Sequence, residues 1–346
     1  DRSLVHYLAA PIRGLGVFLV PVCTAFTFVI NIAIPSAAGC SAAVGSTLIP
    51  VMLRAGIKPA MAAAAVMGGT IGSYFSPGTS HNAYVANMAH MDVMDFIAYH
   101  GPWSLMCGAF LVFGLLIVAL VLGDHKGAKD AVANVKAADD NFKPNPIMAF
   151  MTLVPIIILV VGNVWVPAIK MGVAQAMVVG AVIMLLFSYA FNRTSPQDFS
   201  KQFFNGLGKG YADVMGIIIA AGVFASGLTS TGLIDTFVDV LKHSNDIARW
   251  GGSLGPWMMG VITGSGDAAT MAFNEAVTPH APEFGMEIHS LGALAFLTGA
   301  LGRTMSPIAG AMVVVSGIAM VSPMEVAKRT ALPVTLAVFA LAILMV

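Results

Sequence analysis

Charged residues are scarce in this sequence. Only 10% of its 346 residues are Asp, Glu, Lys or Arg, whereas 58% are hydrophobic. A soluble globular domain carries about 25% charged residues, and its surface cannot accommodate so large an apolar excess. The scarcity of charge therefore excludes a soluble fold and predicts a multi-pass protein whose solvent is the lipid bilayer.

Excess charge of one sign, paired cysteines and catalytic motifs are also absent. The charges of the 17 basic and 17 acidic residues cancel, so the sequence lacks the excess of positive charge that nucleic-acid binding requires. Cys23, Cys40 and Cys107 stand singly in apolar stretches, so neither a disulfide framework nor a metal-binding CxxC pair is predicted. No HExxH or GxSxG pattern occurs. We expect a protein that is not an enzyme and has no cofactor or metal.

Apolar runs of about 20 residues, enough to cross a bilayer, divide the chain into predicted elements. Uninterrupted runs predict membrane spans at 102–123, 146–168, 171–191, 211–229 and 326–346. Other runs are interrupted by Gly, Ser or Pro, and they predict helical hairpins at 16–55 and 250–282 and broken helices at 60–96 and 289–322. The polar stretch 124–145 is predicted to be a solvated cytoplasmic linker.

Two parts of the sequence resemble each other. Residues 70–77 align with 300–307 at an offset of 230, and an offset of 229 pairs Ser36 with Ser265 and Gly56 with Gly285. The second copy would cross the membrane an odd number of times, so the copies must be inverted. The predicted fold is an all-α polytopic membrane protein with inverted repeats, two re-entrant hairpins and two broken transmembrane helices.

The repeat also predicts the domain organisation. Residues 1–123 would form the first repeat without its three opening spans, and 146–346 would form the complete second repeat. We therefore interpret the chain as a fragment of a longer protein. With 124–145 in the cytoplasm, the same side receives every Lys and Arg except Lys170, Lys242, Arg249 and Arg303, as the positive-inside rule requires. Arg303 falls within the membrane.

The four interruptions predict a binding site. Irregular backbone at membrane depth survives where it lines a cavity, and secondary transporters with inverted repeats bind substrates where such half-helices meet. Helix N-termini after a break present free N–H groups and a positive dipole that suit a carboxylate. The candidate substrate-binding residues are Ser36, Gly39, Ser41, Ser76, Gly78, Thr79, Ser80, Asn82, Ser265, Gly266, Thr270, Arg303, Thr304 and Ser306.

Ionisable residues at the breaks suggest how transport is coupled to an ion. Asp267 lies at a predicted midplane break, where an acidic residue is costly and usually functional. It could take up a proton, ligate a cation or pair with Arg303, and His81 is a weaker candidate for proton or substrate contact. Arg303 could hold a carboxylate through two parallel hydrogen bonds. The structural alternative is an Asp267–Arg303 ion pair and simple turns at the breaks.

The motifs resemble a known family. Ala33-Ile34-Pro35-Ser36-Ala37-Ala38-Gly39, Leu48-Ile49-Pro50 and Phe75-Ser76-Pro77 resemble the DcuC-type anaerobic C4-dicarboxylate carriers, and the resemblance runs from about residue 10 to 346. The tip Gly264-Ser265-Gly266-Asp267 is similar to tips in neighbouring families of the ion-transporter superfamily. The resemblance implies a homodimer with an elevator mechanism in the cell inner membrane. It also implies transport of succinate, fumarate or malate, coupled to protons or sodium.

Other functions remain open from the residues alone. The chain could carry another organic anion, such as citrate, a keto acid or an acylated amino acid. Arg303 as the only buried base argues against a substrate with three charges. A sodium/proton antiporter would use Asp267 as its cation site and Arg303 as a structural residue. Dependence of transport on an organic anion distinguishes these functions.

Overall fold

A computed structural model describes residues 16–126, 154–164, 166–169, 171–192, 195–233 and 245–345, together with Thr236 and Asp239. Helices are the only regular elements in these ranges. In chain order they are η2 (Gly16–Phe18), α2 (Leu19–Ala33), α3 (Ala37–Arg54), α4 (Pro59–Gly69), η3 (Gly72–Phe75), α5 (Ser80–Met88), α6 (Val93–Val121), α8 (Val154–Val164), η5 (Pro167–Ile169), α9 (Val173–Asn192), α10 (Pro196–Ser230), α12 (Asn245–Thr263), α13 (Gly266–Ala276), η6 (Thr278–Phe284), α14 (Ile288–Met305), α15 (Gly310–Ala319) and α16 (Pro323–Leu344).

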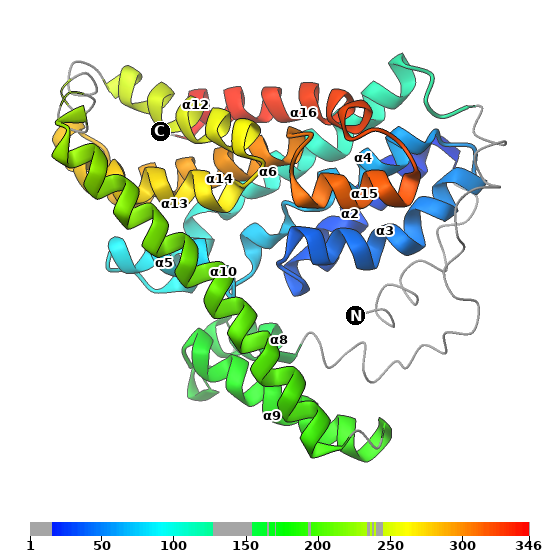
Figure 1. The fold of residues 1–346 in the computed structure, drawn as a ribbon, viewed down its shortest axis with the longest axis horizontal. Helices are drawn as coiled ribbons and strands as arrows, with labels where there is room; N and C mark the ends of the chain where they lie inside the picture. The colour runs from blue at the N-terminus through cyan, green and yellow to red at the C-terminus, as the bar shows by residue number, and fades with distance from the viewer. Residues whose placement is uncertain are drawn as a thin grey trace.

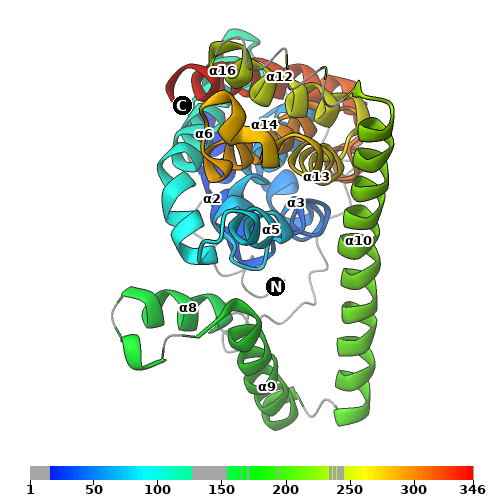
Figure 2. The same cartoon turned by 90° about the vertical axis from the view of Figure 1, so that its left-hand side faces the viewer.

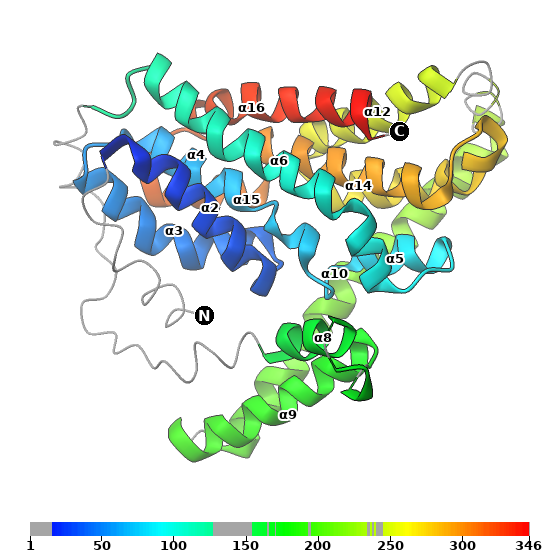
Figure 3. The same cartoon turned by 180° about the vertical axis from the view of Figure 1, so that it is seen from behind.

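The helices form a bundle and a smaller group beside it. Helices α2 to α6 intermingle with α12 to α16 in the bundle, while α8 and α9 lie apart from it (Figures 1 and 3). The long α10 runs from the α8–α9 pair to the bundle, where its C-terminal part packs on α13 (Figure 2). The predicted linker 124–145 lies almost wholly outside the described residues, as do residues 1–15 of the first predicted repeat.

Several helices are suited to a bilayer. Within the described part of the chain, five segments are long and apolar enough to cross one: 16–33, 37–54, 93–121, 288–319 and 323–344. Large apolar side chains on their outer faces are exposed, including Phe113 and Ile343. Since such faces would be unstable in water, the structure agrees with a multi-pass membrane protein.

The centre of the bundle is built from small residues that let helices approach closely. Helix α4 carries the run Ala62-Ala63-Ala64-Ala65, and all four side chains are fully buried. It packs against helices from both halves of the chain, namely α2, α3, α6, α15 and α16. Small residues at helix contacts are the usual packing device within membranes, where dispersion replaces the hydrophobic effect.

Helix α10 begins earlier than the sequence pattern suggests. The expected span 211–229 is only its C-terminal part, because the helix starts at Pro196. Ser195 caps this end by accepting a hydrogen bond from the backbone N–H of Asp198, and Pro196 occupies the first helical position. Both are standard start signals, and they extend the helix over residues too polar for a membrane window.

Four of the interruptions between helices of the bundle lie at the breaks predicted from the sequence. These four are 34–36, between α2 and α3; 76–79, after η3; Gly264 and Ser265, between α12 and α13; and 306–309, between α14 and α15. Each coincides with a Gly, Ser or Pro cluster in the sequence. Thus α2 and α3 form one connected helix pair, α12 and α13 form another, and both pairs have packed arms.

Unusual backbone conformations recur at the spacing of the sequence repeat. Among the described non-glycine residues, only His90 and Met320 have positive φ, at 54° and 56°, and they lie 230 positions apart. Gly56 and Gly285 also have positive φ and lie 229 apart. Each of these residues ends a helix in the left-handed conformation, which closes the last turn.

Helix caps recur in the same way. Ser36 caps α3 by accepting from the N–H of Gly39, and Ser265, 229 positions later, caps α13 by accepting from Ala268. At a spacing of 230, Asp92 caps α6 and Ser322 caps α16, each accepting from the N–H two residues on. Similar turns therefore begin and end the matching helices.

A buried acidic residue joins three elements at one end of the bundle. Asp124, just after α6, is 1% exposed and accepts from Arg329 of α16 at 2.6 Å and from Lys58 at 3.2 Å. Its backbone carbonyl also accepts from the N–H of Lys58, the residue that precedes α4. Asp124 thus connects α4, α6 and α16.

Close contact between α12 and α14 depends on glycine at position 302. A Cβ atom there would overlap the backbone carbonyl of Trp257. We expect Gly302→Ala to cost about 1–3 kcal/mol of stability, the usual penalty of overpacking, measured as earlier thermal unfolding in detergent. Gly310→Ala is the control, because no atom lies within 4 Å of its added Cβ. Equal unfolding temperatures for the two variants would contradict this contact.

Candidate functional site

Asp267 lies at the tip of the α12–α13 pair. Gly264 makes the turn with φ +71°, and a Cβ there would lie 2.9 Å from the backbone nitrogen of Ala309. The tip therefore sits directly against the break between α14 and α15. Ser265 then caps α13, which places Asp267 in the first turn with its side chain 64% exposed.

His81 is the direct partner of Asp267. Its Nε2 lies 2.8 Å from Oδ1 of Asp267, and because a carboxylate only accepts, Nε2 carries the proton and donates. The His81 side chain is 3% exposed, and its ring stacks on Phe296 with centroids 5.0 Å apart. Its other nitrogen, Nδ1, is buried and has no hydrogen-bond partner among the residues that the structure describes. The two predicted coupling residues are therefore in contact.

Arg303 does not pair with Asp267. Its guanidinium donates to the backbone carbonyl of Thr70 at 3.0 Å and to the Thr70 hydroxyl at 3.4 Å. The structure therefore does not contain the direct Asp267–Arg303 ion pair that was one of the alternatives. The two charges still interact electrostatically at longer range. Among the described residues, the acceptors of Arg303 are neutral oxygen atoms, and no acidic side chain there forms an ion pair with it.

The carbonyl of Thr70 is open because the backbone unwinds there. Between α4 and η3, the N–H of Tyr74 donates to Ile71, and the N–H of Ser73 donates to Oδ1 of Asn31 at 2.7 Å. Asn31 also donates from Nδ2 to the carbonyl of Ile34 at 2.9 Å. One side chain thus fastens the α2–α3 break to the unwound segment that receives Arg303.

The first predicted tip is formed by Ser36, Gly39 and Ser41. Ser36 and Gly39 are exposed, and the N–H of Gly39 donates to the hydroxyl of Ser36 in the cap of α3. Ser41 lies one turn further on, fully buried, and its hydroxyl has no hydrogen-bond partner in the described part of the chain. A free hydroxyl remains at this end of α3.

Asn82 has a structural role at the break between η3 and α5. Its Nδ2 donates to the carbonyls of Tyr74 and Ser76 at 2.9 and 3.0 Å, and its Oδ1 lies 3.1 Å from Nε2 of His100. The other nitrogen of His100 lies 2.9 Å from Ser104 Oγ. Asn82 therefore satisfies carbonyls that the break leaves unpaired, rather than pointing a free amide at a ligand.

Several other predicted residues also hold backbone. Thr79 donates to the carbonyl of Ser73, Thr304 to Ala300, Ser306 to Val261, and Thr270 makes a longer bond to Ala295. Gly266 packs closely on Ala300, and Gly78 faces Met177 of α9. Ser80 is half-buried in the first turn of α5. These groups shape the breaks around Asp267, His81 and Arg303.

Two contributors to the site were not predicted from the sequence. Thr70 receives the guanidinium, and Phe296 has the rings of His81, Tyr74 and His100 around it at centroid distances of 5.0 to 5.9 Å. A threonine in an alanine-rich helix and a phenylalanine in an apolar run give no local signal of such roles.

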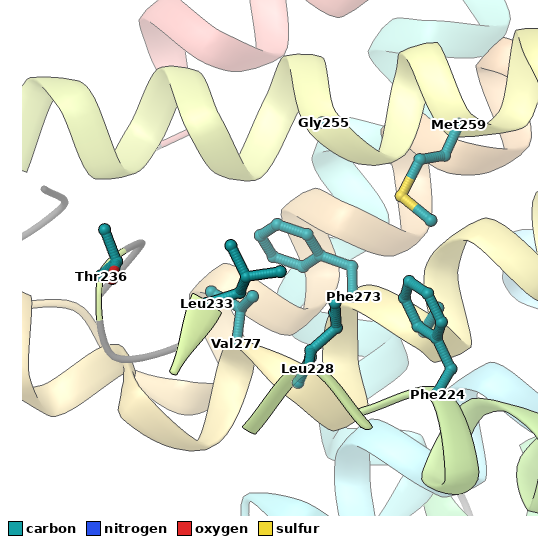
Figure 4. A pocket seen from close by; sticks show the side chains of 10 residues that line it. Phe224, Leu228, Leu233, Thr236, Gly255, Met259, Phe273 and Val277 are labelled. Atoms are coloured by element: carbon teal, nitrogen blue, oxygen red, sulfur yellow. The ribbon is translucent and has the colours of Figure 1, made fainter. Parts of the chain in front are cut away.

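An apolar cavity lies elsewhere, between α10 and the α12–α13 pair. It has a volume of about 480 Å³ and is lined by side chains such as Phe224, Leu228, Met259 and Phe273, with Thr236 at its edge (Figure 4). None of its lining residues is charged. A carboxylate would lose its hydration there without compensation, so the polar groups at the breaks are the better anion site.

Comparison with known proteins identifies the family. A family model described as C4-dicarboxylate anaerobic carrier (DcuC) matches residues 2–346. An uncharacterised transporter from Haemophilus influenzae is 44% identical over 280 residues, covering 78% of this chain and 99% of that protein. The anaerobic C4-dicarboxylate transporter DcuC of Escherichia coli K12 is 26% identical over 310 residues, covering 88% of this chain and 66% of the relative.

Proposed function

The chain belongs to the C4-dicarboxylate anaerobic carrier family, and on that premise we propose that it transports C4-dicarboxylates such as succinate, fumarate or malate across the cell inner membrane. The family resemblance read from the sequence is thereby confirmed, and so is the expectation of a non-enzymatic protein, because the family consists of transporters. The chain spans 66% of the Escherichia coli relative, so substrate and mechanism are proposals for the protein as a whole.

The observation that carries the proposal is the position of Arg303 and the nature of its hydrogen-bond partners. Its guanidinium lies among helix breaks within the bundle, and its hydrogen-bond partners in the described ranges are the two oxygen atoms of Thr70. A positive charge at such a position is costly unless an anion joins it, and a guanidinium binds a carboxylate through two parallel hydrogen bonds. A substrate carboxylate would provide such an anion.

The proposed fold is an inverted repeat with two re-entrant helix pairs, α2–α3 and α12–α13. The recurring caps at Ser36 and Ser265 and the recurring left-handed residues His90 and Met320 support it. Helices also pack in matching combinations, with α4 and η3 of the first copy corresponding to α14 of the second. In the first copy α2 and α6 pack on α4 and η3, and in the second copy α12 and α16 pack on α14.

An elevator mechanism is part of the proposal. The bundle with the four breaks would be the moving part, and α8, α9 and α10 would form the scaffold, since α8 and α9 lie apart from the bundle (Figure 2). Exposed apolar side chains on α9 and α10, such as Leu186 and Phe204, could also bury a homodimer interface. The coupling ion is a proton or sodium, with Asp267 and His81 as the coupling residues.

The test is exchange in proteoliposomes that contain the full-length protein. With unlabelled succinate inside, labelled succinate is expected to enter saturably, and external fumarate or malate should compete whereas butyrate, with one carboxylate, should not. Protein-free liposomes are the control. Absence of exchange, together with sodium-driven proton movement, would contradict the proposal and favour the antiporter.

A further inference from the structure

The two helix pairs of the proposed repeat contact their neighbours in different ways. Helix α3 packs closely along α15, where a Cβ at Gly45 would lie 3.1 Å from Ile318 and where Met312 and Val315 are fully buried. The matching contact of α13 with α5 is much smaller, and the direct bond across it is the His81–Asp267 hydrogen bond. The α3–α15 contact is thus apolar packing, whereas the smaller α13–α5 contact includes a hydrogen bond between two ionisable groups; α13 is otherwise held by its packing on α10, α12 and α14.

The offsets show that neither of these two ionisable residues has an ionisable counterpart in the other copy of the repeat, and the same holds for Arg303. By the repeat, Asp267 corresponds to Ala38 and His81 to Ala311, and Arg303 corresponds to Ser73. The shared scaffold therefore does not need any of the three. A negative charge and two basic side chains have been added at one place, where α5, α13 and α14 meet.

The accessibility of the two partners is opposite. Asp267 is 64% exposed, whereas His81 is 3% exposed, packed on Phe296 and left with a buried, unpartnered Nδ1. The imidazole can reach an anion only at its Nε2 side, which Asp267 now occupies. The buried His81 donates its hydrogen bond to the exposed carboxylate of Asp267. Such a carboxylate can be replaced by the carboxylate of another molecule.

We propose that Asp267 takes the place of a substrate carboxylate and that His81 is a second carboxylate-binding residue beside Arg303. The inference rests on the proposed transport of dicarboxylates. A substrate with two carboxylates would bind Arg303 with one and His81 with the other, after displacing Asp267. The displaced carboxylate of Asp267, now beside the negative charges of the substrate, takes up one proton (H⁺) from the aqueous phase, which couples one proton to each substrate.

Other titratable groups near the pair do not supply the same function. His100 of α6 is bound to Asn82 and Ser104, and Tyr74 of η3 donates its hydroxyl to the carbonyl of Leu297. Glu275 lies about two turns along α13, and its carboxylate faces Gly222 of α10. Only Arg303 adds a positive charge that Asp267 senses.

The test is direct binding of labelled succinate to the purified full-length protein between pH 7 and pH 8.5. Wild-type affinity should rise as the pH falls, by at most about tenfold per unit, which is the limit for uptake of one linked proton. In Asp267→Asn the competing charge is gone, so binding at pH 8.5 should be at least about tenfold tighter and nearly independent of pH. Glu275→Gln removes a carboxylate from the same helix and should behave as wild type.

His81 provides the second arm of the experiment. His81→Leu should weaken succinate binding about tenfold, the equivalent of one lost hydrogen bond to a charged group, and His81→Gln should restore part of it through an amide donor. If Asp267→Asn weakens succinate binding instead, Asp267 is itself needed for binding and the inference is overturned, while the transport proposal stands. If the wild type binds no succinate at any pH, both fail.

Discussion

Succinate exchange is expected to fall at least about 100-fold when Arg303 is replaced by alanine. Two hydrogen bonds from a guanidinium to a carboxylate are worth roughly 1.5–3 kcal/mol each, and their loss corresponds to two or more orders of magnitude. Thr70 cannot replace the guanidinium, because its carbonyl only accepts and would repel a substrate anion, and its hydroxyl already donates to the carbonyl of Met67 at 2.7 Å. Initial exchange rates over a range of succinate concentrations measure the effect.

Two further variants separate charge from geometry at this position. Arg303→Lys keeps the charge but not the planar pair of donors, so we expect exchange between that of the wild type and that of the alanine variant. Arg54→Ala removes an exposed arginine from the end of α3 and should leave exchange unchanged. Near-normal exchange by a folded Arg303→Ala protein would show that the guanidinium only fastens α14 to Thr70.

The largest loss of stability is expected from Asp124→Ala. This substitution removes the buried carboxylate that accepts from both Arg329 and Lys58 and leaves the 12%-exposed Arg329 without that partner. Breaking a buried ion pair in this way typically costs about 3–5 kcal/mol, because the remaining charge is uncompensated. Denaturant or thermal unfolding in detergent would measure the change.

Glu325 provides the matched control for Asp124. It also contacts Arg329, at 3.1 Å, and Lys328, at 2.7 Å, but its side chain is 46% exposed. Ion pairs in contact with water contribute little to stability, so Glu325→Ala should be nearly neutral. Similar losses in the two variants would mean that burial of Asp124 does not dominate the cluster.

The breaks were predictable because their causes are local. Ser36, Ser265, Ser76 and Ser306 lie in clusters of Gly, Ser or Pro, and such residues disturb a helix whatever packs around them. The start of α10 had a local signal too, Ser195 followed by Pro196, but the apolar pattern outweighed it.

The partners of the site residues were not predictable in the same way. His81 and Asp267 lie 186 positions apart in the sequence, and Arg303 and Thr70 lie 233 apart. Which acceptor a guanidinium finds depends on how helices from both halves pack. For the same reason the sequence could not show that Asn82, Thr304 and Ser306 hold backbone carbonyls, while Ser41 keeps a free hydroxyl.

The 3₁₀ geometry of the short helix η3 affects the length of the segment 59–75. On the proposed repeat, 59–75 matches 288–305, so the first copy is one residue shorter than the 18 residues of α14. A 3₁₀-helix rises about 2.0 Å per residue and an α-helix about 1.5 Å. With the four residues of η3 in the stretched form, 17 residues reach roughly 27.5 Å and 18 α-helical residues reach roughly 27 Å. The missing residue is thus made up by unwinding, and the same unwinding opens the Thr70 carbonyl to Arg303.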